Sequence, residues 1–152
     1  MRRIQVFSFI TLFAAAAIIA CGDSTSPEVQ AITGSWQFAD SLLNWGRDTR
    51  CTSGSGTLTI TPAGDMFTGT LTDETLCTGP SDTTQASGSR SGTIQNGVVT
   101  STAVSFSVAF CNYVGTLSGS PPNMMSGDER CVLHSETTTD SWVFTADWQA
   151  TR

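Results

Sequence analysis

Residues 57–72 of the chain read TLTITPAGDMFTGTLT, and this stretch decides the fold class. Apolar side chains alternate with threonines on both sides of a centre, PAGD, that is made of turn-forming residues. Alternation with a period of two is typical of a strand with one buried face. The stretch therefore predicts an antiparallel hairpin. We pair Ile60 with Phe67 and Leu58 with Gly69, so that the apolar positions share one face.

The same alternation recurs through most of the chain. With 24 Thr and 19 Ser against 7 Arg and no Lys, the composition favours strands over helices. Merging one pair of candidate strands leaves about eight, and an up-and-down antiparallel β-barrel would remove the open edges of such a sheet. We therefore expect an all-β barrel, with a β-sandwich as the alternative. The candidate strands are 34–39, 56–61, 66–72, 90–95, 98–101, 103–109, 112–118, 124–131 and 141–150.

Several connections can be assigned from turn-forming residues. Asn96-Gly97 lies between apolar residues and predicts a two-residue hairpin turn. The alternation changes phase after Phe110, which fits either a bulged strand or a tight hairpin turn. Residues 79–90 are polar and glycine-containing and are predicted to form a loop. Residues 40–45 are predicted to form one helical turn.

The N-terminus has the pattern of an export signal. Arg2 and Arg3 precede a mostly apolar run over residues 4–20, as in secretory signal peptides. The run ends in IIAC, which resembles the lipobox of bacterial lipoproteins. The resemblance implies that Cys21 is acylated, becomes the first residue of the mature chain and anchors it to a membrane of the cell envelope. By analogy with the sorting of Gram-negative lipoproteins, Gly22 in the second mature position, rather than Asp, implies the outer membrane.

This resemblance divides the chain into three parts. Residues 1–20 form the signal peptide, residues 21–32 a lipidated tether and residues 33–152 the β-barrel domain. The tether is rich in Ser, Thr, Pro and Asp and has little to bury. Loss of the signal leaves five Arg against thirteen acidic residues, a formal charge of −8. So acidic a chain lacks the basic surface that nucleic acids require.

The remaining four cysteines fit structural disulfides. An even number of cysteines in an exported chain predicts two bridges. The cysteines form no CxxC pair, so the sequence does not indicate a zinc site. In a second predicted hairpin, which turns at Pro121, the register places Cys111 opposite Cys131. In the first hairpin Cys51 falls one residue short of Cys77, a difference that a bulge absorbs. We therefore predict the disulfides Cys51–Cys77 and Cys111–Cys131.

Gly34-Ser35-Trp36 on the first predicted strand is similar to the Gly-x-Trp signature of lipocalins and related calycin barrels. The resemblance implies that Trp36 packs at the closed end of the barrel, beneath an arginine from a late strand, for which Arg152 is the candidate. It also suggests a small apolar ligand inside the barrel, although eight strands leave an interior that aromatic side chains alone can fill. The candidate ligand-binding residues are Phe67, Phe106, Tyr113, Trp142 and Phe144.

Residues suited to catalysis are few. His134 is the only histidine and is interpreted as a loop or strand-end residue. The acidic pairs Asp73-Glu74 and Asp128-Glu129 lie near predicted strand ends and are interpreted as solvated charges. Neighbouring strand residues also point to opposite faces, so neither pair forms an acid–base couple. We expect no enzyme activity, no cofactor and no metal.

Composition and motifs together favour a binding protein. We expect an envelope-anchored lipoprotein whose disulfide-bonded barrel binds a small apolar ligand or serves as another non-catalytic binding module. The alternatives are a protein-binding inhibitor of a cationic lytic enzyme, which an acidic surface would attract, and a structural or adhesion protein. The expected partners are a membrane, through the lipid, and a small ligand or protein, with no nucleic acid. We expect a monomer.

Overall fold

The computed structural model describes residues 25–41, 44–45, 49–78, 85–134 and 141–152. Nearly all of them lie in strands, as the alternation predicts. In chain order the elements are α1 (Pro27–Ile32), β1 (Gly34–Ser41), β2 (Asn44–Trp45), β3 (Thr49–Ala63), β4 (Met66–Thr78), β5 (Gln85–Val99), β6 (Ala103–Val108), β7 (Cys111–Gly119), β8 (Pro122–His134) and β9 (Ser141–Thr151).

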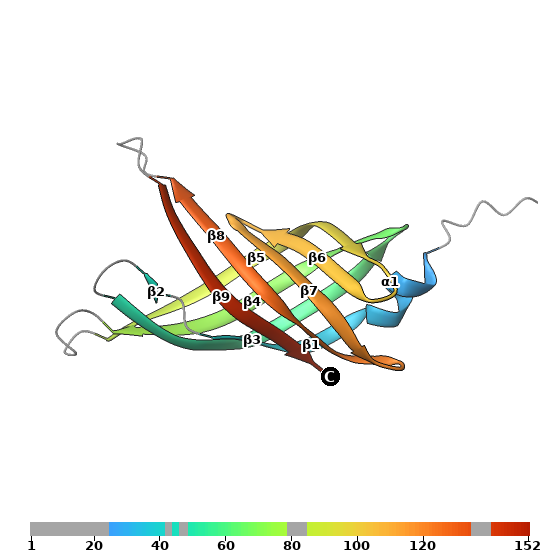
Figure 1. Cartoon of the computed structure of the whole chain (residues 1–152), viewed down its shortest axis with the longest axis horizontal. Coiled ribbons are helices and arrows are strands. Elements are labelled where there is room, and N and C mark those ends of the chain that lie inside the picture. The colour runs from blue at the N-terminus through green and yellow to red at the C-terminus, as the bar shows by residue number, and fades with distance from the viewer. Residues whose placement is uncertain (1–24, 42–43, 46–48, 79–84, 135–140) are drawn as a thin grey trace, which may run out of the picture.

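The strands form one antiparallel sheet that closes on itself (Figure 1). From β3 to β9 each strand pairs with the next one in the sequence, and β1 pairs with both β9 and β3. The short β2 pairs with β3 at one edge, which leaves eight strands in the ring. The predicted eight-stranded up-and-down barrel is therefore confirmed, and the β-sandwich alternative is wrong.

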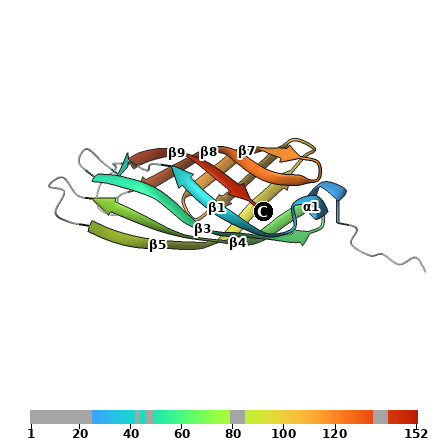
Figure 2. The ribbon, with the colours of Figure 1, turned by 90° about the horizontal axis from the view of Figure 1, so that it is seen from below.

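Helix α1 covers one end of the barrel (Figure 2). The Ser26 side chain accepts a hydrogen bond from the Val29 N–H, and Pro27 begins the helix, two features that favour a helix start. Val29 and Ile32 are fully buried against the core. Residues 27–32, which we expected in the tether, are thus part of the folded domain. Among the described segments there is no helix with the length and apolar character of a membrane span.

Trp36 and Arg152 pack together at the same end. The Trp36 indole N–H donates to the Ile32 carbonyl at 2.8 Å. The Arg152 guanidinium carbon lies 4.3 Å from the centre of the Trp36 ring, a cation–π distance. Arg152 also donates to the carbonyls of Thr33 and Pro122. The last residue of the chain therefore joins β9 to the segment that precedes β1, as the calycin resemblance implies.

The hairpin of residues 57–72 forms with a register that differs from the prediction. Leu58 pairs with Leu71, whereas we expected Gly69 opposite it. The turn is shorter than predicted because Gly64 adopts a φ of 68°, which a two-residue turn requires, and Pro62 stays in β3. The shift of two residues leaves the same side chains on the inner face.

The predicted hairpin turn at Asn96-Gly97 is wrong. β5 continues through these residues, and the pairing with both neighbouring strands shifts there, as at a bulge. Asn96 has a φ of 52°, which suits a bulge as well as a turn, so the dipeptide alone does not distinguish the two. The turn comes later, where the Thr100 N–H donates to the Ala103 carbonyl.

Three further connections were open or differ from expectation. The phase change after Phe110 is a tight turn, with Val108 paired to Cys111. β5 begins at Gln85, inside the predicted loop of residues 79–90, because its hydroxyl-rich residues pair with β4 and suit a solvent-facing strand surface. The described part of residues 40–45 is extended and belongs to β1 and β2, so the predicted helical turn is wrong.

Candidate functional site

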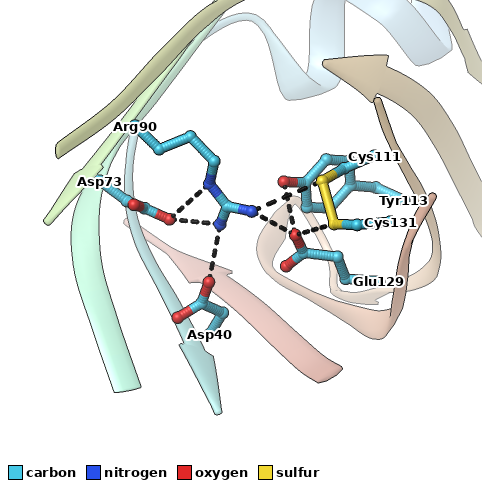
Figure 3. Close-up of a disulfide and its surroundings, with 7 residues drawn as sticks. All are labelled: Asp40, Asp73, Arg90, Cys111, Tyr113, Glu129 and Cys131. Carbon is cyan, nitrogen blue, oxygen red and sulfur yellow. Dashed lines mark hydrogen bonds and ion pairs between the residues drawn. A yellow bond between two sulfur atoms is a disulfide. The ribbon is translucent and has the colours of Figure 1, made fainter. Parts of the chain in front are cut away.

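Four ionisable side chains meet inside the barrel beyond its apolar core (Figure 3). We call them the interior charge cluster: Asp40 on β1, Asp73 on β4, Arg90 on β5 and Glu129 on β8. The period of two continues the buried face of each strand, so that Asp40 follows Phe38 and every carboxylate points inward. The side chains of the three acids are at most 1% exposed, and that of Arg90 is 20% exposed.

Arg90 is the centre of the cluster. Its Nη1 donates to Glu129 Oε1 at 2.5 Å, and its Nη2 donates to Asp40 Oδ2 at 2.7 Å. Both Nε and Nη2 donate to Asp73 Oδ2, and Nη1 also lies 3.7 Å from Cys111 Sγ. These five contacts match the five N–H groups of a guanidinium. Arg90 therefore has no donor left for a ligand.

The two oxygens of Glu129 have different surroundings. Oε1 accepts from Arg90 and from the Tyr113 hydroxyl at 3.0 Å, and Cys131 Sγ lies 3.1 Å away. Oε2 is buried and has no hydrogen-bond partner among the residues that the structure describes. Burial raises the pKa of Glu129, although Arg90 opposes the shift.

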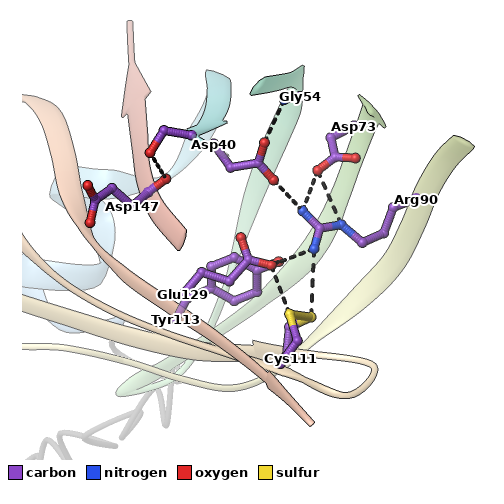
Figure 4. Close-up of polar contacts among 10 residues, drawn as sticks. Asp40, Gly54, Asp73, Arg90, Cys111, Tyr113, Glu129 and Asp147 are labelled. Atoms are coloured by element: carbon purple, nitrogen blue, oxygen red, sulfur yellow. Dashed lines mark hydrogen bonds and ion pairs between the residues drawn. A yellow bond between two sulfur atoms is a disulfide. The ribbon is translucent and has the colours of Figure 1, made fainter. Parts of the chain in front are cut away.

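Asp40 is held between two donors (Figure 4). The backbone N–H of Gly54 donates to Oδ1 at 2.6 Å, and Arg90 donates to Oδ2. Burial nevertheless raises the pKa of Asp40, and the nearby charge of Asp73 adds to this rise. The two hydrogen bonds thus compensate only part of the cost of desolvating the carboxylate.

The disulfide Cys111–Cys131 lies beside the cluster and joins β7 to β8. The two residues are direct cross-strand partners, as the predicted register requires. Cys51 and Cys77 are also opposite each other in the backbone register of β3 and β4, and the expected bulge lies between Thr52 and Ser55. Their side chains lie outside the described ones, so the Cys51–Cys77 disulfide stays a prediction.

The predicted ligand-binding rings that the structure describes are packed against other rings. Phe67, Phe106 and Tyr113 are at most 3% exposed. Phe106 stacks on Tyr113 with ring centres 4.6 Å apart, and Phe67 meets its edge at 6.1 Å. This contact pattern is that of a filled core. The side chains of Trp142 and Phe144 lie outside the described ones, as does Cys21.

The interpretation of Asp73 and Glu129 as solvated strand-end charges is wrong. β4 continues to Thr78 and β8 to His134, so both carboxylates lie in the middle of long strands. The signal was present in the sequence, because Asp73 has the same parity as the buried Leu71. Arg90 and Asp40 were not predicted as site residues, because they lie at the ends of segments predicted as a loop and as a helical turn.

Cys111, Cys131 and Glu129 are of types that bind metals and lie together. Thiolate is the metal-binding form of cysteine, however, and both sulfurs are joined in the disulfide. The cation of the interior charge cluster is Arg90. Its ion pairs join four strands, β1, β4, β5 and β8, across the barrel. Neither a protein-family model nor a curated protein nor a solved structure matches this chain.

Proposed function

We propose that the chain is a non-catalytic binding module of the bacterial cell envelope, anchored by lipid on Cys21, that recognises a cationic protein through its outer surface. The observation that carries the proposal is the filled interior, in which Phe67, Phe106 and Tyr113 contact one another or neighbouring rings. A closed, packed barrel supplies a rigid scaffold, and recognition then falls to the outer face. The chain enters the barrel at α1, and the proposed lipid is attached six residues before the first residue of this helix.

The outer face of β7, β8 and β9 has the features of a protein-binding surface. Val114 and Val143 are 60% and 51% exposed. Asp128 pairs with Val114 on one side and with Asp147 on the other, and both acids are exposed. Like charges on directly paired residues destabilise a sheet. Exposed valines beside two acids that face each other suit a partner with an apolar centre and a basic rim.

The outer face of β3, β4 and β5 offers a matched control surface. It carries cross-strand rows of hydroxyl side chains, such as Thr59, Thr70 and Thr93, and no charge at these positions. Neutral hydroxyls give a cationic partner little to recognise at long range. The acid-to-amide and threonine-to-alanine variants therefore test one face against the other on the same scaffold.

The test is the binding and inhibition of lysozyme, as a cationic lytic enzyme, by the full-length protein. Asp128→Asn combined with Asp147→Asn should weaken binding about tenfold or more at low salt, whereas Thr70→Ala with Thr93→Ala should not. Equal loss in both variants, or no binding to lysozyme or other basic lytic enzymes, would overturn the proposed partner. A stoichiometric small-molecule adduct in native mass spectrometry would instead support the apolar-ligand function expected from the sequence.

The anchor is tested by labelling cells with radioactive palmitate. The natural chain and the control Ser24→Ala should incorporate label, and Cys21→Ser should not. Label that persists in Cys21→Ser would place the lipid elsewhere and contradict the lipoprotein assignment.

A further inference from the structure

The interior charge cluster does not balance its own charge. With every group ionised, three carboxylates face one guanidinium, which leaves a formal charge of −2 inside the barrel. An uncompensated buried charge is costly, and a buried carboxyl group usually takes up a proton instead. The geometry of the cluster shows which carboxyl group is best placed to do so.

Among the residues that the structure describes, Glu129 Oε2 is a buried carboxylate oxygen without a hydrogen-bond donor. Asp40 receives one donor on each oxygen, and Asp73 Oδ2 receives two from Arg90. Both donors of Glu129, from Arg90 and Tyr113, reach Oε1 instead. A proton on Oε2 would remove one negative charge and break none of these contacts.

The groups around Glu129 come from every neighbouring part of the barrel. Asp40 on β1 and Asp73 on β4 are acidic, Arg90 on β5 is cationic, and Tyr113 on β7 donates its hydroxyl. Burial raises the pKa of Tyr113, which keeps the phenol neutral. On β9 the residue opposite Glu129 is Ala146, and on β6 the neighbour of Cys111 is Val108.

We propose that the barrel binds one proton at neutral pH, on Oε2 of Glu129, and that this proton lowers the negative charge that Arg90 has to compensate between the two walls of the barrel. The inference does not depend on the proposed binding function. One wall supplies Asp40, Asp73 and Arg90, and the other supplies Glu129 with the disulfide. Loss of the proton adds a second uncompensated negative charge to the cluster and destabilises the folded barrel through the cost of burying that charge.

The sign of the pH dependence follows from the direction of the shift. Burial raises the pKa of Glu129 in the folded protein, so between the ordinary carboxyl range and the raised value the folded chain holds a proton that the unfolded chain has lost. The folded state is then most stable at the acidic end of this window, and stability falls as the pH rises. One proton corresponds to at most a tenfold rise in the unfolding equilibrium constant per pH unit.

The first experiment counts protons by calorimetry of the full-length protein at pH 7. Unfolding in phosphate and in Tris should give enthalpies that differ by the ionisation heat of about one proton, released when Glu129 enters water. Glu129→Gln, which keeps an acceptor at Oε1 and places an amide NH2 at Oε2, should abolish the difference. It should also unfold at the same or a higher denaturant concentration.

Asp40→Asn is the matched control and should leave the released proton in place. Equal enthalpies in the two buffers for the natural chain would overturn the proposal, whether or not the variants fold. A proton lost with Asp40→Asn and kept with Glu129→Gln would overturn its assignment to Glu129. A markedly less stable Glu129→Gln protein would show an ionised Glu129 and overturn the proposal as well.

Discussion

The same alternation of inward- and outward-facing residues builds both halves of the barrel interior, but the two halves are stabilised differently. Near α1 the inward positions hold Trp36, Leu58 and Ile60, which are stabilised mainly by apolar packing. Farther along, the same faces hold the interior charge cluster, where each group depends on a particular partner atom. The comparison teaches that an apolar layer loses stability gradually as side chains are removed. A buried ionic layer loses most of its stability when its single cation is removed.

The largest effect is expected at that cation. Arg90→Met keeps most of the side-chain volume but leaves three buried acids without their common partner, and we expect a loss of about 3–5 kcal/mol in unfolding free energy. Urea titration followed by tryptophan fluorescence measures it. Arg130→Met, on the exposed side of β8, is the control and should stay within about 0.5 kcal/mol. A loss below about 1 kcal/mol for Arg90→Met would contradict the claim that the ionic half of the interior depends on its single cation.

A comparable effect is expected in the apolar half. Trp36→Ala removes a ring that is 0% exposed and should cost about 3–5 kcal/mol, because the cavity cannot collapse fully. The exposed neighbour Gln37→Ala should change little. Guanidinium titration at two pH values sharpens the comparison: the cost of Trp36→Ala should be independent of pH, unlike that of Arg90→Met. A cost under about 0.5 kcal/mol would contradict the packing of Trp36 at the barrel end.

The smallest effect is expected at the surface of the apolar half. Arg152→Ala removes the cation over Trp36, and we expect a loss of about 0.5–1 kcal/mol. Arg152→Lys keeps the charge but not the planar group, so its loss should fall between those of the natural chain and Arg152→Ala. Thermal unfolding at low and high salt measures both. Identical stabilities for all three proteins would show that the contact contributes nothing.

Much of the fold could be predicted because its signals are local. The alternation of Val104, Phe106 and Val108 with serines marks both a strand and its inner face, and the register around Pro121 placed Cys111 opposite Cys131. The hairpin at Asn96 was mispredicted because the same positive φ serves a bulge and a turn.

The candidate site was harder to predict because its members come from separate strands. Asp40, Asp73, Arg90 and Glu129 are far apart in the sequence, and only barrel closure brings them together. The parity of Asp73 and Glu129 was readable, but their burial depends on strands that continue well beyond the apolar alternation. Arg90 gave no signal, because a serine- and glycine-rich stretch beside it looks the same in a loop and on the outer face of a strand.

The ring closes between its first and last strands, with Gln37 paired to Thr151. A chain threaded through an export channel N-terminus first cannot make this contact until its final residues have passed. The partly emerged chain is an open meander that lacks the contacts of its last strand. In the export that we propose for this chain, the ring would therefore close only after β9 has been translocated.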